Sequence, residues 1–332
     1  MSEDMMRGAQ TLVETCARVR SSENVLIVCD HPMMEIAEAV ARAARAREAD
    51  VVIAIMDPRG TDAGEPPLPI AEAMRASDVV FTPVSISITH SDAVHSACAS
   101  GTRIVAMTGF TRRMMMSGGM TADFPKVRPI VAAVAGAFSD GSTLRLTTPG
   151  GTDLTVDISQ RHGVAKTCIV EPGDFSPVPD IEAAVAPVEG SAEGVIVADA
   201  SIPYLGIGVL SEPVTFKVSE GMIVSVEGGE PAEKLLAAWE SQGDPWVYNV
   251  AEVGVGLNPE STLTGEMLED EGVWGTVHIG TGTNVTLGGN IRAASHYDLL
   301  MFAATVTIDG KVILRDGELV GWDEELRAAG LL

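Results

Sequence analysis

The residues best suited to chemistry lie near the carboxyl end of the chain, where His296-Tyr297-Asp298 opens an apolar stretch typical of a β-strand. Side chains two positions apart on a strand point to the same face, so His296 and Asp298 can address one metal ion together. Taken alone, a histidine and an aspartate at this spacing are more often a hydrogen-bonded structural pair. Further ligands are needed to decide between the two interpretations.

Three other ionisable residues stand out because each lies in an apolar run. His278 lies among glycines and apolar residues, Glu252 interrupts an apolar run, and Glu182 leads another. A buried charge costs on the order of several kcal/mol unless it is paired or binds metal. Because Zn²⁺, Mn²⁺, Co²⁺ and Fe²⁺ all accept carboxylate and imidazole ligands, these three residues are candidate ligands too.

The net charge of −24, from 46 acidic and 22 basic residues, argues against nucleic acid and anionic membranes as partners. Both are bound through basic patches, and we expect the acidity to be a solvated surface rather than a substrate-steering field. No apolar run approaches the roughly 18–20 residues that a membrane span needs. The four cysteines have no C-x-x-C spacing and the first residues do not resemble a signal peptide, so a cytoplasmic location is expected.

The elements that must position these residues divide into two predicted domains, residues 1–124 and 125–332, since 332 residues exceed one ordinary domain. In the first domain, short apolar strands alternate with helices. This alternation predicts an α/β domain in which a parallel sheet is covered by helices on both faces. The strands are expected at residues 25–29, 50–56, 78–83 and 103–107, and the helices at 9–20, 32–47, 70–76 and 91–100.

The second domain has a different texture, with apolar strands joined by glycine-rich turns. Residues 143–148 and 152–158 flank Pro149-Gly150-Gly151 and are expected to form a hairpin. Further strands are expected at residues 194–198, 214–218, 222–226 and 303–314, with one helix at 230–240. These patterns predict a β-rich α+β domain, which would carry the metal site.

The remaining histidines have ordinary structural explanations; they are His31, His90, His95 and His162. Ser91 or Asp92 is expected to cap a helix rather than to contact a substrate. Asp30 is expected to lie in an ordinary turn after the first strand, although ligands often bind at that end of a parallel sheet. No nucleophile elbow, P-loop or dinucleotide-binding motif is present, so no nucleotide cofactor is expected.

These segments, in this order, resemble the thermophilic-type metallo-aminopeptidase family, that of aminopeptidases T and S. The resemblance covers most of the chain and is clearest at residues 108–114 with 120–123, 182–191, 251–259, 275–280 and 295–299. It implies a homodimer that binds one or two divalent ions, Zn²⁺, Mn²⁺ or Co²⁺. It also implies five metal ligands, with one carboxylate bridging two ions: Glu182, Glu252, His278, His296 and Asp298.

Two departures from the aminopeptidases bear on the activity. That family carries a tyrosine shortly after the His278 position, whereas residues 280–288 contain none and Val285 lies near that place. The stretch between His278 and His296 is also shortened. A related branch, the 2,5-dihydroxypyridine 5,6-dioxygenases, binds a single Fe²⁺ through an altered ligand set that keeps the terminal His-x-Asp. Because Glu252 and His278 are retained here, the sequence favours the hydrolase type of site.

We therefore predict a metal-dependent hydrolase that cleaves an amide or related C–N bond of a small molecule or short peptide. The metal would activate a water molecule, and Glu182 or Glu252 would accept its proton. Two alternatives remain open. One is an Fe²⁺-dependent ring-cleaving dioxygenase acting on a hydroxylated pyridine or similar aromatic, and the other is a non-catalytic binding protein of the same fold.

Overall fold

The computed structural model describes residues 2–60, 64–89 and 91–332, so His90 lies outside the described residues. The chain forms two compact units, residues 1–125 together with 167–180, and residues 126–166 together with 181–332. The predicted division at 124/125 did not assign the segment 167–180 to the first unit. This segment contains β8 (Phe175–Pro177), which pairs in parallel with β4 (Arg103–Thr108) and thereby extends the sheet of the first unit.

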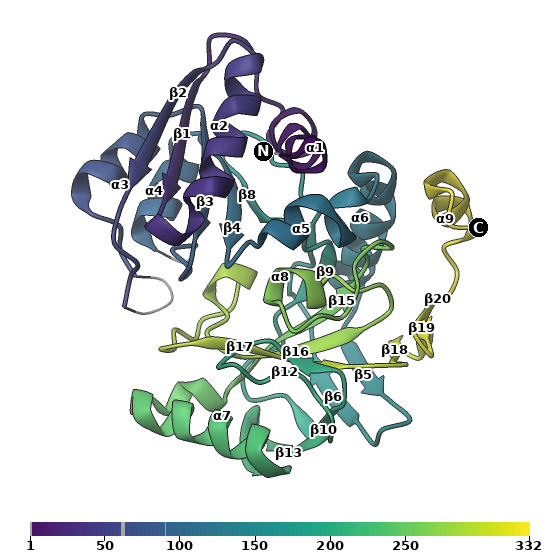
Figure 1. Ribbon diagram of the computed structural model, residues 1–332. Helices are drawn as coiled ribbons and strands as arrows, with labels where there is room; N and C mark the ends of the chain where they lie inside the picture. The colour runs from purple at the N-terminus through teal and green to yellow at the C-terminus, as the bar shows by residue number, and fades with distance from the viewer. Residues whose placement is uncertain (1, 61–63, 90) are drawn as a thin grey trace. The chain divides into compact units, whose positions relative to one another are not determined.

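The sheet of the first unit is parallel, in the order β2-β1-β3-β4-β8. Its other strands are β1 (Asn24–Cys29), β2 (Asp50–Ile55) and β3 (Val79–Val84). Leu26 and Val28 of β1 belong to the core under α3 (Leu68–Arg75) and α4 (Asp92–Ala99). Alternate residues face α2 (Met34–Ala46), which lies beside β1 and β2 on the opposite face (Figure 1). The predicted parallel sheet with helices on both faces is confirmed.

Serine side chains mark the first residues of two helices, α1 and α4. The predicted helix at residues 9–20 instead begins at Glu3, as α1 (Glu3–Gln10), and continues as a π-helical turn to Cys16. The Ser2 side chain caps α1 by accepting a hydrogen bond from the Met5 N–H. Ser91 caps α4 in the same way, accepting from the Val94 N–H at 3.4 Å, as predicted.

Two helices precede the second unit or lead into it. The short α5 (Arg112–Met116) is capped by Thr111, and the longer α6 (Phe124–Asp140) begins where the domain boundary was predicted. Neither was predicted. In α6 the interior Pro129 weakens the helical signal of the sequence, because proline removes a backbone hydrogen bond.

The second unit contains an antiparallel sheet in the order β14-β13-β10-β6-β5-β18-β19-β20. Its predicted hairpin is present as β5 (Thr143–Thr147) and β6 (Asp153–Asp157), which pair directly. The helix α7 (Gly229–Gln242) packs against β13 and β14, as Figure 1 shows in green. The remaining strands of this sheet are β10 (Glu193–Ala198), β13 (Val214–Ser219), β14 (Met222–Glu227), β18 (Thr305–Ile308), β19 (Lys311–Arg315) and β20 (Glu318–Leu319).

A second antiparallel sheet of this unit has the order β17-β16-β15-β9-β7. Its strands are β7 (Val164–Lys166), β9 (Glu182–Val185), β15 (Val250–Gly256), β16 (Val277–Gly282) and β17 (His296–Met301). Smaller elements complete the unit: β11 (Ser201–Ile202), β12 (Gly208–Val209), α8 (Met267–Asp270) and α9 (Asp323–Ala329). Parallel and antiparallel sheets together confirm the predicted mixture of helices and strands.

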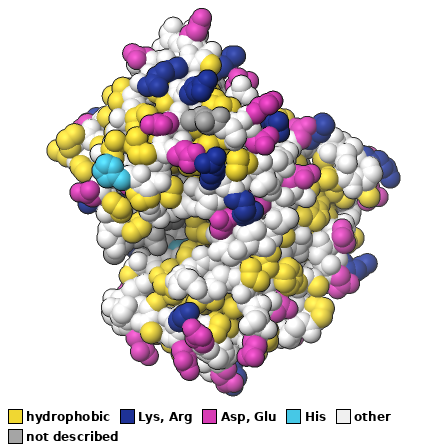
Figure 2. Space-filling model, viewed as in Figure 1, with side chains coloured by type: hydrophobic (Ala, Val, Ile, Leu, Met, Phe, Trp, Pro, Cys, Tyr) yellow, Lys and Arg dark blue, Asp and Glu magenta, His cyan; other side chains and the backbone are white. Residues whose placement is uncertain are grey.

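The charged side chains of one face can be followed in Figure 2. On the face shown in Figure 2, Asp and Glu side chains are distributed with Lys and Arg side chains among them, as the predicted solvated surface requires. The four cysteines are free thiols. Over the described part of the chain, no helix combines the length and apolarity needed to cross a membrane.

Candidate metal centre

The register of the sheet β17-β16-β15-β9-β7 places the predicted ligands on one face. Glu252 lies opposite Gly280, and Gly280 lies opposite Asp298. His278 is two residues from Gly280 on β16, and His296 is two residues from Asp298 on β17. Both histidines therefore lie on the same face as Glu252, Gly280 and Asp298. Glu182 lies opposite Gly256, which is four residues from Glu252, and it therefore joins the same face. The face gathers Glu182 from β9, Glu252 from β15, His278 from β16, and His296 with Asp298 from β17.

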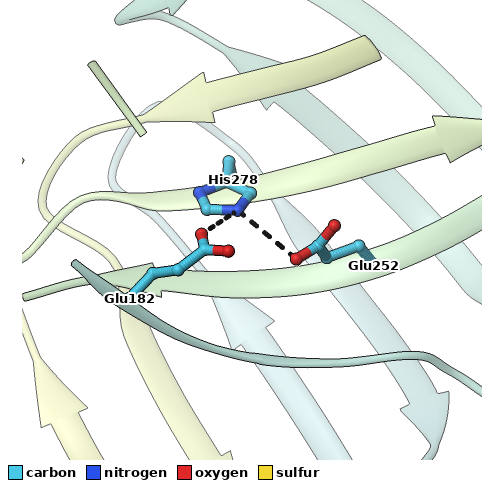
Figure 3. Close-up of side chains that lie close together, drawn as sticks. All are labelled: Glu182, Glu252 and His278. Carbon is cyan, nitrogen blue, oxygen red and sulfur yellow. Dashed lines mark ion pairs between the residues drawn. The ribbon is translucent and has the colours of Figure 1, made fainter. Parts of the chain in front are cut away.

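Three of these side chains form a buried group in which two carboxylates meet one imidazole (Figure 3). The Nε2 atom of His278 lies 2.9 Å from Oε2 of Glu182 and 3.9 Å from Oε1 of Glu252. All three residues are at most 3% exposed. Their ligand atoms lie within 4.8 Å of one another, a spacing at which they could hold a metal ion.

A second group shares Glu252 with the first. The Nε2 atom of His296 lies 3.0 Å from Oε2 of Glu252 and 3.4 Å from Oδ1 of Asp298. The ligand atoms of these three residues also lie within 4.8 Å of one another. All five residues singled out in the sequence are therefore brought together, and Glu252 lies between the two groups.

Glycines on the same face make room for the two imidazoles. A Cβ atom on Gly254 would lie 2.0 Å from Nε2 of His278, and one on Gly280 would lie 2.6 Å from Nε2 of His296. Each of these distances is far below van der Waals contact. Glycine thus alternates with the functional residues along β15 and β16, and this period of two is a sequence signal for a site built on strands.

The charged neighbours of this group keep the carboxylates of Glu252 and Asp298 ionised. Burial raises the pKa of Glu252, but the Lys166 ammonium and the neighbouring His278 and His296 imidazoles outweigh it and hold that pKa well below its ordinary value. Burial likewise raises the pKa of Asp298, yet the neighbouring His296 lowers it to about 2.

The two imidazoles shift in the opposite direction from that expected of burial alone. Burial lowers the pKa of His278 and His296, but Glu182 beside the first and Asp298 beside the second raise both well above the ordinary value. Because a metal-bound imidazole must be neutral, binding of a cation would release these protons. Metal affinity at this site should therefore increase with pH.

The hydrogen bonds of the imidazoles also suit a metal. Nδ1 of His296 lies 2.7 Å from the Thr283 carbonyl oxygen and must carry the proton in that bond, which leaves Nε2 to face the carboxylates. Oδ1 of Asp298 and Oε1 of Glu252 have cationic neighbours at 3.4–4.0 Å, but within the described chain neither accepts a hydrogen bond. Buried atoms of this kind call for a ligand. The carboxylate and imidazole ligands, the room that Gly254 and Gly280 leave and the two oxygens without hydrogen bonds together fit a divalent ion.

Two residues at the site were not predicted. Lys166 lies 2.5 Å from Oε1 of Glu182 through its Nζ atom. The Tyr204 hydroxyl lies 2.7 Å from Oδ2 of Asp298 and 2.9 Å from Oε1 of Glu271. Lys166 ends a strand of three residues and Tyr204 follows one of two residues. Such short elements carry no periodic signal, so only the spatial pairing reveals these residues.

The other residues weighed in the sequence have structural partners elsewhere. Asp30 is buried and accepts a hydrogen bond from the Ser85 N–H at 2.7 Å. His95 is exposed on α4, and His162 lies 3.5 Å from the Ser139 hydroxyl through Nδ1. None of them belongs to either candidate metal group of the described chain.

Comparison with known proteins gives related sequences and structures. A sequence model of the 2,5-dihydroxypyridine 5,6-dioxygenase family (NicX) matches residues 5–321. The 2,5-dihydroxypyridine 5,6-dioxygenase of Pseudomonas putida KT2440 is 25% identical over 269 residues, which cover 77% of this chain and 74% of that protein.

Two solved structures share the fold. That of 2,5-dihydroxypyridine dioxygenase from Pseudomonas putida KT2440 has a TM-score of 0.83 at 22% identity and covers 98% of this chain and 100% of that chain. Wild-type AmpT from Thermus thermophilus has a TM-score of 0.65 at 16% identity, covering 96% and 99%. The second likeness confirms the relation to the aminopeptidase fold that the sequence indicated.

Proposed function

Because the chain belongs to the 2,5-dihydroxypyridine 5,6-dioxygenase family, we propose that it is a metal-dependent dioxygenase that opens the ring of a hydroxylated pyridine or similar aromatic. The observation that carries this proposal is the family match over residues 5–321, joined to a buried group of carboxylates and imidazoles that could hold a metal. The proposed substrate is a small molecule, and the homodimer stays a prediction.

The predicted metal-dependent hydrolase is wrong. The family match and the Pseudomonas putida relative both name a dioxygenase, which was the first alternative. The error came from giving the retained Glu252 and His278 more weight than the chain as a whole. Both branches use the same fold and the same terminal His-x-Asp, so these residues do not by themselves separate hydrolysis from ring cleavage. The role of Glu182 or Glu252 as proton acceptor for a hydrolytic water falls with the hydrolase.

We assign the metal to the group formed by Glu252, His296 and Asp298. These residues supply one imidazole nitrogen and carboxylate oxygens, a mixture that suits Fe²⁺. When bound, a ferrous ion supplies open coordination positions at which O₂ and a chelating hydroxy-aromatic can meet. A non-catalytic binding protein has weaker support, because the named relative is an enzyme and the chain has this buried donor set.

The residues around the proposed ion orient its ligands and keep water away. His296 keeps its proton on Nδ1, at the Thr283 carbonyl, so that its Nε2 lone pair faces the ion. Tyr204 holds the second oxygen of Asp298. On β15 and β16 every residue is buried, so the sheet itself excludes solvent from one side of the site.

Oxygen uptake tests the proposal. Protein loaded anaerobically with Fe²⁺ should consume O₂ when 2,5-dihydroxypyridine is added, measured with an oxygen electrode, while Zn²⁺-loaded protein should not. His162→Ala is the matched control for His296→Ala, since His162 is an exposed histidine. Uptake should persist in the first variant and vanish in the second. An iron-loaded, folded protein that leaves O₂ unchanged with a panel of hydroxylated pyridines and related aromatics would refute the proposal.

A further inference from the structure

Lys166 lies on the same face as the proposed metal ligands. It ends β7, where it pairs directly with Glu182 of β9, so both side chains project from the sheet in one direction. Its Nζ atom lies 2.5 Å from Oε1 of Glu182 and 4.0 Å from Oε1 of Glu252. The Lys166 side chain is only 21% exposed. A lysine ammonium is therefore held against two carboxylates that could otherwise ligate metal.

The ammonium lies closer to the ligands of one candidate ion group than to those of the other. In the group of Glu182, Glu252 and His278, one oxygen of Glu182 faces Lys166 and the other faces His278. In the group of Glu252, His296 and Asp298, Lys166 reaches the shared Glu252 at 4.0 Å from Oε1, while Oε2 of Glu252 faces His296. The two groups thus differ in how closely a protein cation approaches their ligand atoms, 2.5 Å at Glu182 against 4.0 Å at Glu252.

The charge balance points the same way. The five candidate ligands include three carboxylates, and Lys166 contributes one positive charge. With neutral imidazoles, these groups carry two negative charges, which one divalent ion neutralises. A second divalent ion would give the five ligands and Lys166 together a net positive charge, and it would lie close to an ammonium of the same sign.

We propose that Lys166 is a built-in cation that takes the place of a second metal ion, so that the site binds a single ion at Glu252, His296 and Asp298. Lys166 is then the residue that sets metal stoichiometry. This inference rests on the metal centre proposed above, and it adds a role for a residue outside the ligand set. Removing the charge should open the group of Glu182, Glu252 and His278 to a second ion.

Metal counting tests the inference directly. Wild type, Lys166→Met and Lys166→Arg are dialysed to equilibrium against Mn²⁺, and bound metal per chain is measured by inductively coupled plasma mass spectrometry. Wild type and Lys166→Arg should bind one ion, and Lys166→Met should bind two. Lys217→Met is the matched control, because Lys217 is 62% exposed and pairs with Glu227 on the other sheet; it should bind one ion.

Several results would overturn the inference. Two ions of similar affinity in the wild type would do so, as would a folded Lys166→Met protein that still binds one. If Lys166→Met does not fold, the number of ions bound per chain by Lys166→Gln and by the wild type decides whether the inference holds. Oxygen uptake is scored separately: one bound ion without dioxygenase activity refutes only the proposed function, whereas two bound ions with activity refute only the role of Lys166.

Discussion

The Tyr204 hydroxyl lies 2.7 Å from Oδ2 of Asp298, although 94 positions separate the two residues in the sequence. The Tyr204 ring also packs against that of Tyr297, with the ring centroids 4.9 Å apart. A neighbour that fixes a metal-binding carboxylate is a common determinant of metal affinity. Tyr204 is thus a positioning residue for the proposed metal centre.

Tyr204→Phe should therefore weaken metal binding by about tenfold or more while leaving the fold intact. The ring and its packing remain, and only the hydroxyl that holds Asp298 is lost. Affinity is measured by competition with a chromophoric chelator. Tyr248→Phe is the matched control, because the Tyr248 ring packs on Trp239 and its hydroxyl has no hydrogen bond in the described structure. Equal affinities in the two variants would show that Tyr204 does not position Asp298.

Gly280→Ala should disrupt the metal centre. The new Cβ would lie 2.6 Å from Nε2 of His296 and 2.7 Å from Cβ of Glu252, so the imidazole and the strand must both move. Overpacking of this kind costs about 1–3 kcal/mol of stability. We expect lower metal content and a lower free energy of unfolding in urea.

The control for this change is Gly136→Ala on α6, where a new Cβ meets nothing within 4 Å. This exchange should stabilise the protein by about 0.5–1 kcal/mol, because alanine favours helix more than glycine does. Metal content should match the wild type. If Gly280→Ala behaves like Gly136→Ala, the glycines on β15 and β16 do not serve to make room for the imidazoles.

Glu189 should make stability depend on acid pH. Partial burial raises its pKa, but the Asn290 N–H, the Asn284 amide and Arg161 outweigh this effect and lower the pKa to about 2. A carboxylate with a depressed pKa stabilises the folded state above its unfolded pKa of 4.5, and the contribution disappears as pH falls from there toward 2. The contacts with Asn284 and Asn290 tie Glu189 to the segment that joins β16 to β17.

Glu189→Gln should accordingly lower stability near pH 7 by about 1 kcal/mol, a value reduced for solvent screening of a partly exposed group. The difference from wild type should shrink as pH falls below 4.5. Thermal unfolding followed by circular dichroism across this range measures it. Glu233→Gln, an exposed position on α7, serves as control. A difference that stays constant from pH 7 to pH 3 would show that Glu189 does not contribute in this way.

The ligands themselves give the simplest prediction. Asp298→Ala should lose the metal and the activity together, while circular dichroism remains that of the wild type. Within the described chain, the side-chain contacts of its carboxylate are those with His296 and Tyr204, and the strand β17 retains its backbone pairing with β16. Full metal content in this variant would remove Asp298 from the proposed ligand set.

The sequence predicted much of this site because its signals lie along strands. The period of a strand places His296 and Asp298 on one face, and Glu252 and His278 stood out because each breaks an apolar run. Glu182 was singled out because it leads an apolar run, and the resemblance to the aminopeptidases implied that all five residues are metal ligands. The structure places all five together, although their function as ligands stays a proposal.

What the sequence did not predict depends on long-range pairing. Lys166 reaches the site only because β7 joins the edge of the sheet, and Tyr204 only because its loop lies near β17. The segment 167–180 belongs to the first unit because Phe175–Pro177 pairs with β4. The local sequence does not predict this contact. The activity was predicted wrongly because the fold is shared with both a dioxygenase structure and an aminopeptidase-type structure, so the fold does not separate the two reactions.

Ring opening in the presence of ¹⁸O₂ tests the central claim most directly. Iron-loaded protein is incubated with 2,5-dihydroxypyridine under ¹⁸O₂ in ordinary water, and the product is analysed by mass spectrometry. Our account predicts a ring-opened product that contains oxygen from both atoms of O₂, and no such product with the Asp298→Ala variant. A product that takes its new oxygen only from water would contradict the account.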